Sequence, residues 1–128
     1  MKRFKILLFF FSLVFFSAIW SQEIFTQIDK PIRVSSENPT VTIQLAANQT
    51  TGYQWTLLKY NENFVKSVEY QYIPSNSRLL GAPGIAQFKV TLTPTAFTAK
   101  NQIILNFIYK RPWEKKPGQS KKVILNTQ

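Results

Sequence analysis

The sequence predicts an all-β domain, an immunoglobulin-like antiparallel β-sandwich of about seven strands. Apolar and polar residues alternate with a period of two along most of the chain after residue 21. No long segment shows the competing 3.6-residue period of a helix, and turn-forming residues recur at short, regular intervals. Short alternating strands separated by such turns are the pattern expected of a sandwich or barrel.

Residues 1–21 are predicted to be a secretory signal peptide, and residues 22–128 a single mature domain. Three basic residues precede an apolar run, Ile6–Ile19, which is short for a membrane span of ~20 residues. Small residues close the segment, so we expect cleavage near Ser21 and a secreted or periplasmic protein. The alternative is an uncleaved N-terminal anchor.

Strands are expected where the alternation is clearest. The strongest alternation runs from Ile103 to Tyr109. Pro31 marks the first strand region as an edge, because proline cannot donate a ladder hydrogen bond. The expected strand regions are 24–34, 41–45, 53–57, 68–72, 88–92, 103–109 and 123–125.

The composition argues against an enzyme and predicts no metal site and no cofactor. The chain contains no His and no Cys, which removes the usual general base, the thiol nucleophile and the commonest metal ligands. The six carboxylates show no spacing typical of a paired acid and base or of a calcium loop. No glycine-rich phosphate cradle follows a strand.

Three unusual loops are expected at one end of the sandwich. If consecutive strands run antiparallel, the loops 48–52, 74–84 and 110–120 all fall at the same end. Immunoglobulin variable domains cluster their binding loops in this way. For each loop alone, an ordinary connection with its large side chains folded over the core remains open.

The candidate binding residues follow from the content of these loops. Two stiff threonines and Gly52 suggest a shaped first loop, and a Trp held by Pro and Arg in the third is typical of binding hot spots. The first-loop candidates are Asn48, Gln49, Thr50, Thr51, Gly52 and Tyr53. The second-loop candidates are Leu79, Leu80, Gly81, Ala82, Pro83 and Gly84, and the third-loop candidates are Arg111, Pro112 and Trp113.

At these residues the sequence resembles the chagasin family of cysteine protease inhibitors. The family carries an N-P-T-T-G-Y-x-W-like first loop, a G-x-x-G second loop and an R-P-W third loop. The matches are Asn48, Thr50, Thr51, Gly52, Tyr53 and Trp55; Gly81 and Gly84; and Arg111, Pro112 and Trp113. Gln49 stands where the family usually has proline, which loosens the loop and raises the cost of ordering it.

The resemblance implies that residues 22–128 form a chagasin-like inhibitor domain whose partners are papain-like cysteine proteases. The first loop would lie over the catalytic Cys–His pair, with Thr50 and Thr51 nearest the thiolate. Trp113 would stack on one wall of the cleft and the segment 81–84 would approach the other. The inhibitor is expected to be a monomer that binds no nucleic acid and, after cleavage of the leader, no membrane.

Two other functions stay open at this point. One is a secreted immunoglobulin-like adhesion or assembly module that binds through a sheet face or edge. The other is a binder of anionic polymers, because removing the three leader cations from the chain's 16 leaves 13 against 6 acidic residues, a net charge of +7. Its contacts would be Lys110, Lys115, Lys116, Lys121 and Lys122. Asn48 also begins an N-x-T glycosylation acceptor, and a glycan there would obstruct the first loop.

Overall fold

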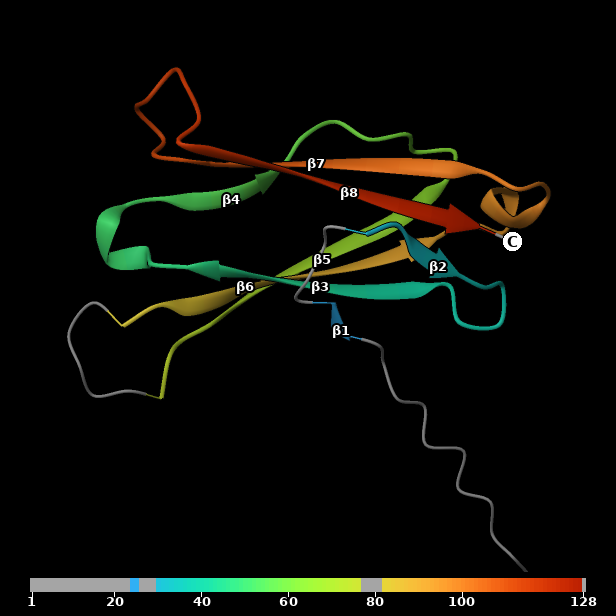
Figure 1. The fold of residues 1–128 in the computed structure, drawn as a ribbon, viewed down its shortest axis with the longest axis horizontal. Coiled ribbons are helices and arrows are strands. Elements are labelled where there is room, and N and C mark those ends of the chain that lie inside the picture. Colours follow the sequence, from blue (N-terminus) through green and yellow to red (C-terminus); the bar gives the residue numbers. More distant parts are fainter. Residues whose placement is uncertain (1–23, 26–29, 77–81, 128) are drawn as a thin grey trace, which may run out of the picture.

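The protein folds as two four-stranded β-sheets packed face to face (Figure 1). A computed structural model describes residues 24–25, 30–76 and 82–127. The first sheet, in order, contains β1 (Ile24–Phe25), β3 (Thr40–Ala47), β6 (Gly84–Leu92) and β5 (Val65–Ile73). The second contains β2 (Ile32–Val34), β8 (Gln119–Thr127), β7 (Gln102–Lys110) and β4 (Gln54–Leu57). The predicted all-β sandwich is confirmed.

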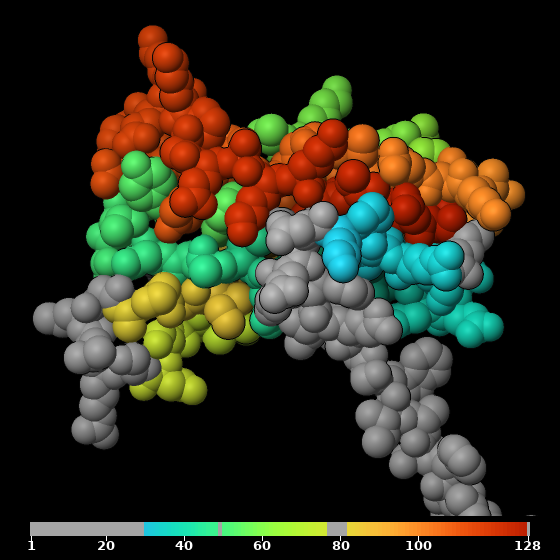
Figure 2. All heavy atoms as spheres, viewed as in Figure 1, coloured from blue at the N-terminus to red at the C-terminus, as the bar shows by residue number. Residues whose placement is uncertain are grey.

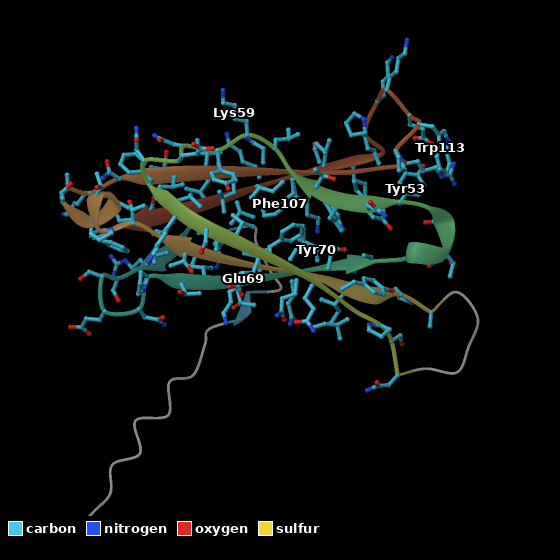
Figure 3. The ribbon with its side chains drawn as sticks, turned by 180° about the vertical axis from the view of Figure 1, so that it is seen from behind. Tyr53, Lys59, Glu69, Tyr70, Phe107 and Trp113 are labelled. Atoms are coloured by element: carbon cyan, nitrogen blue, oxygen red, sulfur yellow. The ribbon has the colours of Figure 1, made fainter. Side chains whose placement is uncertain are left out.

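The core lies between the two sheets because alternate side chains of each strand point inward. In β6 every second residue from Gly84 to Leu92 is buried. Figure 3 shows Phe107 of β7 in the middle of this layer, where its ring meets that of Phe88 edge-on at 4.9 Å between centroids. Phe107 and Leu105 are completely buried, so the period of two in the sequence is the period of the core.

The first predicted strand region divides into two short strands that pair with different sheets. β1 runs parallel to β3 and β2 runs parallel to β8, whereas the pairs among β3 to β8 are antiparallel. Pro31 lies directly before β2, which is an edge strand, as the sequence predicted. β1 and β2 therefore belong to different sheets, a division that local alternation does not reveal.

The predicted leader, residues 1–21, lies outside the described residues. Among the residues that are described, no helix is long and apolar enough to cross a membrane. Export and cleavage near Ser21 therefore stay predictions.

Strand register brings the ends that carry the predicted loops together. In the first sheet Ala47 pairs with Gly84, and in the second Gln54 pairs with Lys110. A hydrogen bond of 2.9 Å from Trp55 Nε1 to the Ala46 carbonyl joins the two sheets at this end. In Figure 1 the turn after β3 and the loop between β7 and β8 lie at the left, opposite the C-terminus. We call the segments 48–53 and 110–118 the loop rim.

Candidate functional site

The first loop of the rim is a short 3-10 turn, Gln49–Thr51, closed by its own polar groups. Asn48 Oδ1 accepts hydrogen bonds from the Thr50 amide at 3.1 Å and the Thr50 hydroxyl at 2.6 Å. The Thr51 hydroxyl donates to the Asn48 carbonyl at 2.8 Å. Both threonines are exposed, yet their hydroxyls are bonded within the loop, so the loop presents a fixed surface to a partner.

Glycine is required at the end of this loop for two reasons. Gly52 has a φ of +80°, in the left-handed region that favours glycine. A Cβ atom there would also lie 3.1 Å from Trp113 Cη2 of the third loop. The first loop therefore packs directly beneath the indole ring, and the predicted closing role of Gly52 is confirmed.

Arg111 holds the two rim segments together. Its Nε donates a hydrogen bond of 3.0 Å to the Thr51 carbonyl, sixty residues earlier in the chain. Its guanidinium lies 4.5 Å above the Tyr53 ring and 5.9 Å from the Trp113 ring. Its Nη1 donates to Glu114 Oε1 at 3.2 Å. One side chain thus contacts the backbone of the first loop and the aromatic groups of both segments.

A column of stacked rings supports Arg111 from below. Tyr53 stacks on Tyr109 at 5.0 Å between centroids, and Tyr109 stacks on Trp55 at 4.8 Å. The Tyr109 hydroxyl accepts a hydrogen bond of 3.1 Å from the Asn48 amide, so the column also anchors the start of the first loop. Rings that stack in this offset manner add to the stability that burial provides. The rim is therefore built onto the core.

The third loop holds its tryptophan in solvent. Trp113 is 72% exposed, the largest value among the exposed large apolar side chains of the described residues. The Glu114 amide donates to the Arg111 carbonyl at 3.1 Å, and the Gly118 amide donates to the Tyr109 carbonyl at 2.8 Å. These bonds close the loop around the indole. Figure 3 shows Tyr53 and Trp113 at the same end of the molecule.

The second predicted loop is described only in part. Leu79, Leu80 and Gly81 lie outside the described residues, Ala82 is half-buried and Pro83 is exposed. Gly84 begins β6 and is buried, and a Cβ there would collide with the Tyr72 hydroxyl and lie 2.6 Å from the Ile73 carbonyl oxygen. This close approach is a packing reason for glycine at 84. Contact of this segment with a partner stays a prediction.

Sequence reasoning missed three supporting residues. Tyr109 was expected only as a strand residue, although an inward aromatic opposite Trp55 is the signal for a stack. Glu114 was not assigned a role, but its position three residues after Arg111 suits a local ion pair. Gly118 abuts the Tyr53 ring, since a Cβ there would lie 3.1 Å from Tyr53 Cε1. All three position the predicted contact residues.

The chemistry of the rim is that of binding. Its exposed groups are threonine hydroxyls, an indole and cations. Within the described part of the chain, no three His, Cys, Asp or Glu side chains gather where they could hold a metal ion. A rigid apolar projection beside a closed polar turn can fill a groove in another protein.

Comparisons with known proteins agree with this geometry. Residues 35–126 match a family model described as Chagasin family peptidase inhibitor I42. Chagasin from Trypanosoma cruzi is 40% identical over 78 residues, a match that covers 57% of this chain and 66% of that protein. The match thus spans slightly less than two thirds of that relative. The crystal structure of the cysteine protease inhibitor EhICP2 from Entamoeba histolytica has a TM-score of 0.61 at 22% identity, over 83% of this chain and 95% of that chain. At that identity the likeness shows the fold alone.

Proposed function

This chain belongs to the chagasin family of peptidase inhibitors, and we propose that it inhibits papain-like cysteine proteases by plugging the substrate cleft with its loop rim. The resemblance drawn from the loop motifs is confirmed by the family match. The expectation of a peptidase inhibitor and not an enzyme is confirmed at the level of the family.

The observation that carries the proposal is the bond from Arg111 Nε to the Thr51 carbonyl, at 3.0 Å, directly beneath an exposed Trp113. It fixes the first loop relative to the third before any partner arrives. Association costs free energy for every side chain and loop that must be ordered, so a rim ordered in advance binds more tightly. The exposed indole of Trp113 beside it can be buried against the protease and supplies apolar contact area.

The same bond gives a reason why the first loop resists cleavage. A protease must bring the carbonyl carbon of the scissile bond into line with its thiolate. The Thr51 carbonyl is instead held by Arg111, and the Asn48 carbonyl accepts from the Thr51 hydroxyl. The loop would lie across the catalytic pair and block it without presenting a peptide bond in the attack geometry.

The substitution of glutamine for the family proline at position 49 is offset within the loop. Proline would restrict the unfolded chain and lower the cost of ordering. Here the two bonds to Asn48 Oδ1 and the bond from the Thr51 hydroxyl restrain the neighbouring backbone. We propose that Gln49 lowers affinity for the protease without abolishing inhibition.

Localisation and oligomeric state form part of the proposal. An inhibitor that meets a secreted or periplasmic protease must be exported, and residues 1–21 have the pattern of a cleaved leader. We propose that the mature protein begins near Gln22 and acts as a monomer. Mass spectrometry of the exported protein and light scattering of the purified domain test these two points.

The central experiment titrates papain with the mature protein while peptide hydrolysis is followed. One-to-one competitive inhibition is expected, and Thr51→Asp and Trp113→Ala should each weaken it in a domain that stays folded. Thr95→Asp, an exposed position in the 3-10 turn Pro94–Phe97 at the other end, is the matched control. A folded protein that leaves papain and related enzymes fully active would refute the proposal. Binding activity that survives both rim variants would favour an adhesion module.

A further inference from the structure

The strongest feature that the proposed wedge does not use is a group of lysines around the third loop. The segment 110–122 contains one carboxylate, Glu114, and its Oε1 is already paired with Arg111 at 3.2 Å. No other ion pair occurs among the described residues. We call five lysines the lysine cluster: Lys110, Lys115, Lys116, Lys121 and Lys122.

The cluster is electrostatically unfavourable in the isolated protein. Lys110 ends β7, two of the lysines lie in the third loop and two lie in β8. Like charges along one short stretch of chain repel one another, and exposed lysines gain little unless a carboxylate is near. The only interaction recorded for these ammonium groups in the described structure is Lys121 Nζ over the Trp55 ring at 5.9 Å. Packing therefore does not explain why the cations are gathered here.

The two lysines of β8 lie on opposite faces of their strand. Alternate residues of a strand face opposite sides of the sheet. Val123 and Leu125 of β8 are buried, so Lys121 lies on the inner side and Lys122 on the outer side. Lys115 and Lys116 follow Trp113 in the loop. Figure 2 shows the segment around residues 110–118 projecting from the body at the end that carries the first loop.

We propose that the lysine cluster forms a second contact area for the protease, selecting enzymes whose cleft is bordered by Asp and Glu. This inference rests on the proposed function. The walls of a cleft that receives the loop rim would lie beside the third loop and the adjoining end of β8, where their carboxylates would meet the lysine cluster. Opposite charges across an interface raise the association rate and penalise partners of the wrong sign. A linear anionic polymer could not contact all of these lysines at once, because the two lysines of β8 lie on opposite faces of the strand.

The test compares two variants of equal net charge. The cluster variant changes Lys115, Lys116, Lys121 and Lys122 to Gln, and the control variant changes Lys30, Lys59, Lys66 and Lys100 to Gln, all of them exposed. Association rates and inhibition constants are measured against one papain-like protease with an acidic cleft border and one with a neutral border, from about 25 to 300 mM salt.

The expected result is an association rate about tenfold lower for the cluster variant against the acidic protease at low salt, a range within electrostatic steering. The difference should vanish at high salt and against the neutral protease, and the control variant should behave as wild type. An equal decrease of the association rate in both variants would overturn the inference about the lysine cluster, while the proposed inhibition of cysteine proteases would stand. Absence of inhibition by the wild-type protein would refute the proposed function itself. Loss of heparin binding in the cluster variant, with unchanged inhibition of both proteases, would assign the lysines to an anionic polymer.

Discussion

Replacing Arg111 by lysine should separate the geometry of the guanidinium from its charge. Lysine keeps the positive charge but has no Nε in the plane of a fork and stacks less well on a ring. The change removes the 3.0 Å bond to the Thr51 carbonyl and the contact with Tyr53 at 4.5 Å. The first loop then loses its hydrogen bond to the third, although the packing of Gly52 against Trp113 and the ring column beneath the loop remain.

The magnitude follows from these contacts. A hydrogen bond from a charged donor contributes about 1.5–3 kcal/mol, and the lower end applies because the Arg111 side chain is 36% exposed. An exposed cation–π contact adds about 0.5–1 kcal/mol. The ion pair with Glu114 is partly exposed and contributes little. A loss of about 2 kcal/mol corresponds to an inhibition constant roughly 30-fold higher, since 1.4 kcal/mol is tenfold.

The assay measures the inhibition constant for papain together with the free energy of unfolding in urea. Arg33→Lys, at an exposed position of the edge strand β2, is the matched control and should change neither value. Amide hydrogens of Thr51 and Tyr53 should also exchange faster in Arg111→Lys, because the first loop is no longer held by Arg111. An inhibition constant within twofold of wild type, with unchanged exchange in the first loop, would refute the reasoning.

Three further predictions follow from single contacts. Trp113→Ala should raise the inhibition constant at least 30-fold while the free energy of unfolding changes by less than about 0.5 kcal/mol, because the ring is exposed. A loss of unfolding free energy as large as the loss of binding free energy would contradict a binding role. Gly52→Ala should cost about 1–2 kcal/mol of stability in urea unfolding and weaken inhibition, since φ is +80° and Trp113 Cη2 lies 3.1 Å from the new Cβ. An unfolding free energy and an inhibition constant equal to those of the wild type would show that the loop is not constrained. Burial, and next the neighbouring Tyr72, raise the pKa of Tyr70 above its ordinary value of 10.0. The unfolded chain therefore loses this proton first, and the contribution to stability is lost as pH rises above about 10. Tyr70→Phe should lose less stability between pH 9 and 11 than wild type. Identical dependence of the unfolding free energy on pH in the two proteins would exclude Tyr70 as the cause.

The elements with the clearest alternation were predictable because burial alone determines their pattern. Every second residue of β6 is buried, and the sequence shows the same period. β8 extends earlier than expected because its first half is held by pairing with β7, although its side chains there are lysine and serine. Hydrogen bonding by a neighbouring strand leaves no trace in side-chain hydrophobicity.

The site was predictable as a set of loops but not as a connected structure. Antiparallel order was sufficient to place the first and third loops at one end, and Trp113 was recognised by its chemistry. The contact between Arg111 and Thr51 joins residues sixty positions apart, and no local pattern predicts such a bond. The division of the first strand region between two sheets was missed for the same reason.

Amide hydrogen exchange of the mature protein, free and in a one-to-one complex with papain, tests the central claim most directly. The account predicts that new protection is concentrated at residues 48–53 and 111–113, with none at Asn61–Phe64 or Pro94–Phe97 at the opposite end. Protection confined to that opposite end or to an outer sheet face, with the rim exchanging as in the free protein, would contradict it.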